Sequence, residues 1–306
     1  SKVKRMRATT KPVGRTRIGI ERCSCSFIRQ RLWRRAHHLV PRGVGKTAKT
    51  GKTGKTADDN NPEPVRIDVS VVLPVYNEEG NIGRMVAAIA GHDCFRDRSL
   101  EVVCVDDGST DGTAAELDEA AERESSGNFG DKGSRKVRVL SHRRRSGQTQ
   151  AIKNGFGACL GDYVVTMDGD YQSDPVEIPK LLGELEDKDR DLVQGYRESR
   201  AEKAGRVFLS RAFNRVISKV AGIHIIDSGC GFKAMKRWVA EELAAQLSSE
   251  MHRFIPYLAV DLGAKVAQVP VTDLKRQSGK SKYTALGRLP RVLLDFLLIC
   301  LMRNDN

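Results

Sequence analysis

The chain has 306 residues, of which 40% are hydrophobic and 30% are charged, proportions that suit a folded globular core. Its net charge of +13 belongs to one end. Residues 1–64 hold 17 of the 52 lysines and arginines and 4 of the 39 acidic residues, so residues 65–306 hold 35 of each sign. The seven cysteines form no C-x-x-C pair, which argues against a disulfide framework or a zinc site and favours a reducing compartment. No secretory signal is visible, and the longest apolar stretch, Val292 to Met302, is too short to span a bilayer.

The first 64 residues form a basic extension of low complexity. The run K-T-A-K-T-G-K-T-G-K-T from Lys46 to Thr56 offers nothing for a core, so we expect this extension to be disordered. Within it, Phe27 to Val40 places apolar residues at helical spacing among arginines. That pattern indicates either a basic amphipathic helix on an anionic membrane or a solvated tail.

From Val65 onward, apolar β-favouring runs alternate with helical patterns, which is typical of a mostly parallel sheet in an α/β domain. The expected strands are Ile67 to Val75, Leu100 to Val105, Val137 to Leu140, Val164 to Met167 and Leu192 to Gly195, and the expected helices are Asn81 to Ala90, Thr113 to Glu124, Gln148 to Leu160 and Val176 to Leu185. We expect one α/β domain over residues 65–284. Residues 285–306 have the helical spacing of an amphipathic or apolar helix at a membrane surface.

Polar residues follow three of the expected strands. Tyr76-Asn77-Glu78 follows the first, Asp106-Asp107 ends the second, and Asp168-Gly169-Asp170 ends the Val164 strand. The carboxyl ends of adjacent strands share one crevice in open α/β sheets, so these groups are expected to face one ligand. Two carboxylates one residue apart repel each other unless a cation joins them. Oxygen ligands favour Mg²⁺ or Mn²⁺, whose shells substrate phosphates often complete.

Two roles are open for the polar residues after the first two strands. Asn77 and Glu78, or Asp106 and Asp107, could accept hydrogen bonds from a base and a ribose. Alternatively they cap helices, and Ser109 or Asp111 would suit an N-cap before the helix that starts at Thr113. We favour ligand contact for Asp106 and Asp107, and capping for residues 110–112.

Four motifs then identify a family. They are P-V-Y-N-E from Pro74, V-D-D-G-S-T-D-G-T from Val105, M-D-G-D-Y-Q from Met167 and G-K-S-K-Y from Gly279. In this order they resemble glycosyltransferase family 2, which has the GT-A fold, and within it the polyprenyl-phosphate glycosyltransferases of the dolichol-phosphate mannosyltransferase group. The resemblance covers about residues 69–294. It implies inverting transfer of a hexose, with mannose favoured, from GDP-mannose or a UDP-hexose to dolichyl or undecaprenyl phosphate.

The resemblance also implies roles for individual residues. The nucleotide sugar would contact Pro74, Tyr76, Glu78, Asp107, Arg276 and Lys280, with Asn77, Asp106 and Gln148 as further candidates. Asp168, Asp170 and Gln172 would hold Mg²⁺ or Mn²⁺, and Arg197, Arg206 and Ser210 would bind the acceptor phosphate. Asp227 would be the acidic residue beside the reacting centre, and with Asp168 and Asp170 it completes the expected catalytic set. Arg144-Arg145 departs from the Arg-Asn pair that often precedes this glycine in the family.

Two other functions are consistent with the sequence. A related transferase acting on a saccharide hydroxyl would need a base, and Asp227 is the only good candidate. A nucleic-acid-binding protein could use the basic extension, but the neutral remainder predicts no sequence-specific recognition. For the first reading we expect a peripheral or monotopic protein on the cytoplasmic face of a membrane. The sequence does not predict an oligomeric state.

Overall fold

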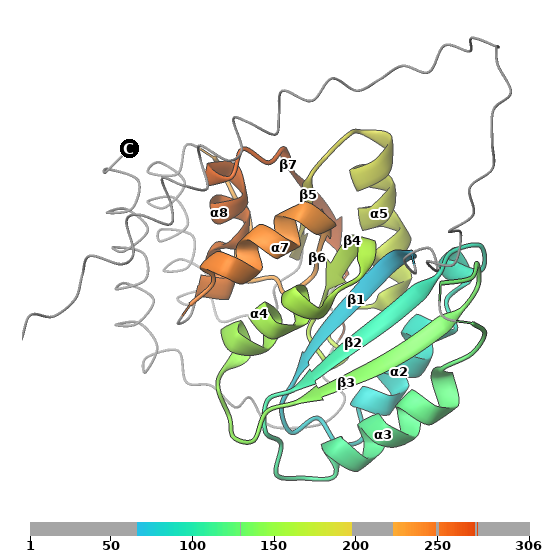
Figure 1. Cartoon of the computed structure of the whole chain (residues 1–306). Coiled ribbons are helices and arrows are strands. Elements are labelled where there is room, and N and C mark those ends of the chain that lie inside the picture. Colours follow the sequence, from blue (N-terminus) through green and yellow to red (C-terminus); the bar gives the residue numbers. More distant parts are fainter. Residues whose placement is uncertain (1–65, 129, 198–222, 249–250, 273, 275–306) are drawn as a thin grey trace, which may run out of the picture. The chain divides into compact units, whose positions relative to one another are not determined.

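The computed structural model describes residues 66–128, 130–197, 223–248, 251–272 and 274 (Figure 1). Backbone contacts divide the chain into Ser1–Asn61 and Pro62–Asn306, and every described residue belongs to the second unit. The expected basic extension and the expected helix over residues 285–306 therefore lie outside the described residues. Among the helices that are described, none is long and apolar enough to cross a bilayer.

A seven-stranded sheet in the order β3-β2-β1-β4-β6-β5-β7 forms the centre of the domain. Its strands are β1 (Ile67–Val75), β2 (Leu100–Asp106), β3 (Arg135–Ser141), β4 (Gly161–Thr166), β5 (Leu192–Arg197), β6 (Lys233–Lys236) and β7 (Val266–Val271). Neighbouring strands are parallel except at β6, which runs antiparallel to both β4 and β5. The predicted mostly parallel α/β sheet is confirmed.

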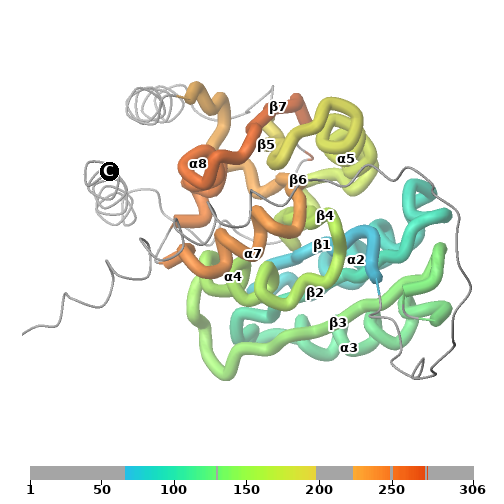
Figure 2. Tube along the Cα trace, turned by 45° about the horizontal axis from the view of Figure 1, so that its top comes forward, coloured from blue at the N-terminus to red at the C-terminus, as the bar shows by residue number. Residues whose placement is uncertain are grey.

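Helices cover both faces of the sheet (Figures 1 and 2). One face carries α2 (Ile82–Ala90), α3 (Thr113–Glu124) and α5 (Ile178–Asp187), and the other carries α4 (Gln148–Ala158), α7 (Arg237–Gln246) and α8 (Ile255–Asp261). Short 3₁₀ turns are η1 (Asp93–Phe95), η2 (Pro175–Glu177) and η3 (Met251–Phe254). The predicted helices match α2 to α5 within three residues at each end, and β6, α7, α8 and β7 were not predicted.

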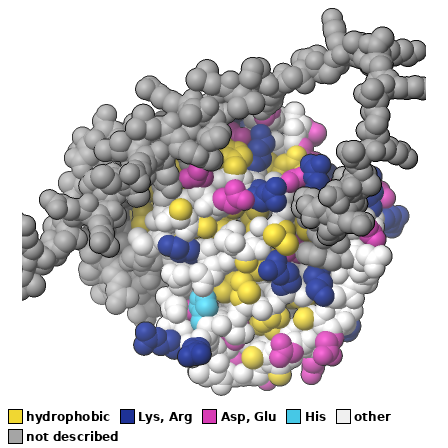
Figure 3. Space-filling view, in the orientation of Figure 1, with side chains coloured by type: hydrophobic (Ala, Val, Ile, Leu, Met, Phe, Trp, Pro, Cys, Tyr) yellow, Lys and Arg dark blue, Asp and Glu magenta, His cyan; other side chains and the backbone are white. Residues whose placement is uncertain are grey.

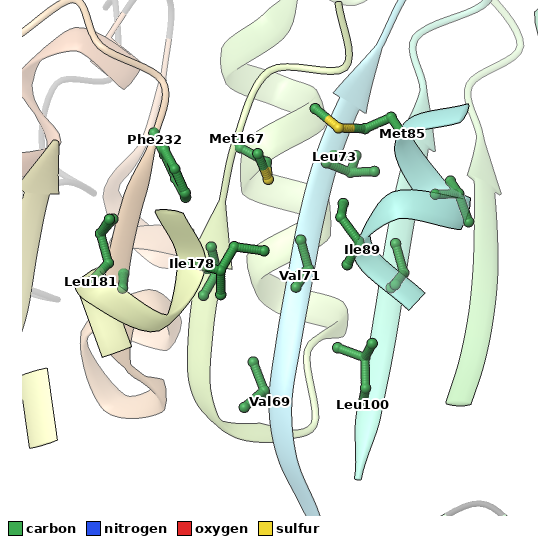
Figure 4. Close-up of a cluster of buried hydrophobic side chains, with 14 of the residues drawn as sticks. Val69, Val71, Leu73, Met85, Ile89, Leu100, Met167, Ile178, Leu181 and Phe232 are labelled. Carbon is green, nitrogen blue, oxygen red and sulfur yellow. The ribbon is translucent and has the colours of Figure 1, made fainter. Parts of the chain in front are cut away.

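The strands alternate between two apolar cores because successive side chains point to opposite faces. Val69, Val71 and Leu73 of β1 are fully buried in the core under α2 and α5 (Figure 4). Val72 is buried in the other core, where Gly155 of α4 faces it so closely that a Cβ on this glycine would collide with the valine. Helix α4 therefore lies unusually near the sheet, which fixes where its first residue, Gln148, can reach.

Candidate active site

The three strands with polar ends, β2, β1 and β4, are neighbours in the sheet and run parallel. The chain passes from β1 to β2 and β3 on one side and returns to β4 on the other, so the strand order reverses at β1. Such a reversal opens a crevice at the carboxyl ends of the strands, where α/β proteins bind ligands. The predicted meeting of these strand ends is confirmed.

Asp168 and Asp170 lie in the loop after β4, and a residue of α4 is bonded to the first of them. Nε2 of Gln148 donates a hydrogen bond to Oδ1 of Asp168 over 2.8 Å. Burial and the charge of Asp170 raise the pKa of Asp168 to about 6, while Lys233 and Arg197 act in the opposite direction. A further positive charge, placed between the two carboxylates, would relieve their repulsion, so Asp168 and Asp170 fit a divalent cation.

The chain turns sharply just after this pair. Tyr171 has a φ of 58°, in the left-handed region that side chains other than glycine seldom occupy. The turn brings the backbone N–H of Gln172 to Oδ1 of Asp170, at 3.2 Å. Across the described residues, no group of three or more His, Cys, Asp and Glu side chains could hold a metal. The expected set has two carboxylates and the Gln172 amide, so it would depend on ligand oxygens from the substrate.

The segment from Asp227 to Lys233 packs directly against Asp168. A Cβ added to Gly231 would come within 2.6 Å of Cγ and Oδ1 of Asp168, so glycine is needed for this approach. The family resemblance placed Asp227 beside the reacting centre, but no role was predicted for Gly231. Two glycines in Gly229-Cys230-Gly231 were the available signal.

Asp227 is paired with Arg197, which joins two residues that were assigned different roles. Nε of Arg197 donates to Oδ2 of Asp227 over 2.8 Å and a terminal nitrogen donates to Oδ1 over 3.3 Å. Asp227 is 5% exposed. In the segment that follows Asp227, the carbonyl of Cys230 accepts from the side chains of Gln194 and of the buried Lys233. Burial lowers the pKa of Lys233, while the charges of Asp168 and Asp227 raise it.

The carboxylates of Asp106 and Asp107 are buried and bonded to the protein itself. Asp106 accepts from the backbone and the hydroxyl of Ser109, at 2.9 and 2.5 Å. Asp107 accepts from the backbone N–H groups of Ser146 and Gly147, at 2.7 and 2.8 Å. Both carboxylates therefore accept hydrogen bonds from loops at the ends of the strands, which was not predicted from the sequence. Their contact with a ligand stays a prediction.

The capping prediction for residues 110–112 is confirmed in part, although the N-cap residue itself is neither Ser109 nor Asp111. The N-cap residue of α3 is Gly112, without a side-chain cap, while Asp111 accepts from the backbone and hydroxyl of Thr113, at 3.1 and 2.6 Å. Ser109 turns instead toward the first loop and accepts from the N–H of Asn77, at 2.9 Å. Because the Ser109 hydroxyl joins the loop after β2 to the loop after β1, it does not cap α3.

The remaining expected residues divide into two groups. Pro74, Tyr76 and Glu78 line the end of β1 and are half-buried. Arg206, Ser210, Arg276 and Lys280 lie outside the described residues. The structure thus brings together the metal candidates, Gln148, Arg197 and Asp227. It does not test the acceptor contacts predicted for Arg206 and Ser210, or the nucleotide contacts predicted for Arg276 and Lys280.

Comparison with known proteins decides the family. The profile of glycosyl transferase family 2 matches residues 70–244. The chain belongs to this family. The dodecaprenyl-phosphate galacturonate synthase of Rhizobium johnstonii is 32% identical over 241 residues, covering 78% of this chain and 68% of that protein. The undecaprenyl-phosphate 4-deoxy-4-formamido-L-arabinose transferase of Sodalis glossinidius is 36% identical over 239 residues, covering 78% and 69%.

A solved structure shows the same architecture. The glucosyl-3-phosphoglycerate synthase of Mycobacterium tuberculosis, in complex with Mg²⁺ and uridine diphosphate, gives a TM-score of 0.53 at 22% identity over 76% of this chain and 79% of that one. At this identity the likeness shows the fold alone. The family 2 resemblance and the GT-A fold read from the motifs are confirmed.

Proposed function

We propose that this family 2 glycosyltransferase moves a sugar from a nucleotide sugar to a polyprenyl phosphate. The observation that supports this most strongly is the joining of two charged sites. The Asp168–Asp170 pair, suited to a cation and a diphosphate, adjoins the Arg197–Asp227 ion pair, whose arginine suits an anionic acceptor. The relatives named above act on dodecaprenyl and undecaprenyl phosphate, in agreement with an acceptor of this class.

Asp168, Asp170 and Gln172 would hold Mg²⁺ or Mn²⁺, the ions found with uridine diphosphate in the mycobacterial synthase. When bound, such an ion neutralises the charge that gathers on the departing nucleoside diphosphate. The protein itself holds the carboxylates of Asp168 and Asp170 close to each other. Gln148 orients Asp168, and the tight turn at Tyr171 orients Asp170.

The transfer needs no general base when the acceptor is a phosphate. An acceptor phosphate oxygen, already anionic at neutral pH, attacks the anomeric carbon while the bond from this carbon to the nucleoside diphosphate breaks on the opposite face, so the configuration inverts. A saccharide hydroxyl would need a base, and Asp227 is a poor one because Arg197 engages both of its oxygens. Arg206 and Ser210, outside the described residues, are proposed as further acceptor contacts.

The sugar and the lipid are finer proposals. The relatives are named for galacturonate and 4-deoxy-4-formamido-L-arabinose, so their names do not favour mannose over other sugars. For the lipid we favour undecaprenyl phosphate, and for the location the cytoplasmic membrane surface. If the apolar segment over residues 285–306 holds the chain there, detergent will release it and high salt will not, since salt screens only charge attraction. Release by salt alone would contradict that anchor.

A donor and acceptor panel tests the function. Purified protein in detergent with Mg²⁺ is given UDP- and GDP-linked sugars together with undecaprenyl or dolichyl phosphate, and the lipid product is identified by mass spectrometry. We expect a single lipid-phosphate sugar from one donor class. Transfer to a saccharide hydroxyl, with no lipid product from any donor, would overturn the proposal.

A further inference from the structure

The first turn of α2 lies beside the loop that carries the acid pair. Gly169, between Asp168 and Asp170, packs so closely there that a Cβ on it would lie 3.3 Å from Cγ2 of Val75 and 3.5 Å from Cδ1 of Ile82. Val75 ends β1, and Ile82 begins α2. The loop therefore rests on the end of one strand and the start of one helix.

An arginine of this helix turn covers the residue that follows Asp170. Cζ of Arg84 lies 5.3 Å from the ring centroid of Tyr171, within the range of a cation–π contact. The ring is half-buried and packs against the apolar core that contains Met85, the next residue of α2 (Figure 4). Arg84 itself is exposed, so it covers the ring from the solvent side. It belongs to none of the sets of site residues predicted from the sequence.

The backbone of Tyr171 has a conformation that its neighbours must hold. A φ of 58° costs free energy for a residue with a Cβ, and it persists only where the surroundings determine it. Asp170 precedes this residue and Gln172 follows it, and both are expected ligands of the cation. If Tyr171 relaxed to a negative φ, the hydrogen bond from the N–H of Gln172 to Oδ1 of Asp170 would break, and the two side chains would diverge.

A carboxylate from α3 fixes the turn of α2 that carries Arg84. The two oxygens of Glu116 accept from the backbone N–H groups of Gly80 and Gly83, at 2.7 and 2.8 Å. A negative charge at the N-terminus of a helix also stabilises that helix through its dipole. The first turn of α2, and Arg84 with it, therefore has a fixed place beside α3.

The backbone after Tyr171 is bound as well. The carbonyl of Gln172 accepts from the N–H of Leu274, which follows β7, at 2.8 Å. Contacts thus hold the loop before, at and after Tyr171, through Gly169, Arg84 and Leu274. The first and last act on the backbone of the loop. The Arg84 contact acts through side chains, so it can be removed without altering the loop itself.

We propose that Arg84 is a positioning residue of the cation site. By covering the ring of Tyr171, it keeps this residue in the left-handed conformation, which directs Asp170 and Gln172 toward the same ion. The guanidinium is no ligand itself, because it has donors and no acceptor. Its positive charge repels a cation through space. Any loss of cation affinity when Arg84 is removed therefore comes through Tyr171.

The inference rests on the proposed function, because it needs a divalent cation at the acid pair. Full-length protein is titrated with Mn²⁺ in the presence of UDP or GDP, and the free ion is measured by electron paramagnetic resonance. We expect Arg84→Ala to bind Mn²⁺ about threefold more weakly, the loss that an exposed cation–π contact accounts for. Arg84→Lys keeps a cation and should retain most of the affinity. Arg96→Ala, which removes an exposed arginine after η1, is the control and should bind Mn²⁺ like wild type.

Substitutions of Tyr171 separate the effect of the ring from that of the backbone. Tyr171→Ala removes the ring but keeps the strain of a left-handed residue, so it should bind Mn²⁺ about tenfold more weakly than wild type. Tyr171→Gly removes the strain as well, so it should bind more tightly than Tyr171→Ala. Adding Arg84→Ala to either variant should cause no further loss, since no ring is left to cover.

Turnover and stability complete the test. In Arg84→Ala the Mn²⁺ concentration for half-maximal turnover should rise about threefold, while the maximal rate changes less. Thermal unfolding without metal checks the folding of each variant, and the Arg84 results stand by themselves if a Tyr171 variant is unfolded. Unchanged or tighter Mn²⁺ binding by Arg84→Ala, or a further loss when it is added to Tyr171→Ala, would overturn the positioning role and leave the proposed function standing. Failure of wild type to bind Mn²⁺ with either nucleotide would contradict both.

Discussion

Asp168 is surrounded by groups from three different parts of the chain. Gln148 bonds it from α4, Gly231 packs on it from the segment before β6, and Asp170 repels it from the same loop. The result is a carboxyl group whose pKa is raised to about 6 and whose position is strictly limited. A side chain held in this way is suited to binding a cation rather than to moving in response to one.

Replacing Asp170 by asparagine should reduce turnover by about two orders of magnitude or more, because it removes one of two charges facing the cation. Folding stability should hold or rise, since one source of repulsion disappears. The measurement is turnover alongside the shift in thermal unfolding caused by UDP with Mg²⁺, which the variant should lack. Excess EDTA should abolish wild-type activity and Mn²⁺ or Mg²⁺ should restore it. Full activity in EDTA would refute the metal assignment.

The Arg197–Asp227 pair allows a test of stability. Arg197→Ala should cost about 3 kcal/mol of unfolding free energy, because it removes the bidentate partner of a buried carboxylate. Adding Asp227→Asn to this variant should recover part of the loss, since the buried charge goes too. Urea denaturation of the two single variants and the double variant measures the coupling. Strictly additive costs would show that the two side chains do not depend on each other.

At the scale of elements, α4 links the sheet to the site. Gly155 faces Val72 and Val105 without room for a side chain, whereas Gly157 has open space around it. The helix can lie against β1 and β2 only because residue 155 lacks a Cβ. That close approach carries Gln148, at the first turn, to Asp168.

These two glycines give a matched pair of substitutions. Gly155→Ala should destabilise the protein by about 1–3 kcal/mol through overpacking, and should lower activity because Gln148 moves with the helix. Gly157→Ala, two residues away, should stabilise it by about 0.5–1 kcal/mol, since alanine favours the helix more than glycine does. Urea denaturation gives both values. Equal effects of the two substitutions would show that α4 does not depend on the gap at Gly155.

The first half of the domain could be predicted from sequence because its strands are continuous apolar runs between clear turn residues. The strand β6 could not, since it reads Lys233-Ala234-Met235-Lys236 and its first lysine is buried with its ammonium on the carbonyl of Cys230. A lysine inside a sheet contradicts the pattern by which strands are recognised. The burial of this strand depends on partners that come from elsewhere in the chain.

The same limit applies to the site. Carboxylates at strand ends were predictable from local pattern, because parallel strands bring their ends together. The contacts Gln148–Asp168, Arg197–Asp227 and Arg84–Tyr171 join residues 20, 30 and 87 positions apart in the chain, and no spacing rule reports them. The sequence therefore predicted where the crevice lies. Only the structure, through the packing of α4 and of the segment around Asp227, shows which contacts position the side chains in it.

For the molecule as a whole, charge separates the extension from the domain. Residues 65–306 hold equal numbers of acidic and basic residues, and on the face in Figure 3 basic side chains are interspersed with acidic ones. The family match and all the candidate site residues fall after residue 65. We therefore expect the positive charge of residues 1–64 to play no part in catalysis.

Removing residues 1–64 should leave turnover unchanged when the acceptor is presented in detergent. Retention on immobilised DNA at low salt should fall sharply, because the removed segment carries the net positive charge. Turnover and retention are measured on the same preparations of full-length and shortened protein. Loss of transfer with intact DNA retention would reverse these assignments and favour the nucleic-acid interpretation.

The strand order has a consequence for how copies of this protein meet. β3 and β7 are the outer strands of the described sheet, and an outer strand can pair with a strand of another molecule. On β7, Pro270 has no N–H and its carbonyl accepts from Lys180. On β3, Ser126 already pairs with Arg135 at the start of the strand, and the exposed Lys136 adds a charge to the open edge. Within the described sheet, both borders therefore disfavour the edge-to-edge pairing of two copies that leads to aggregation.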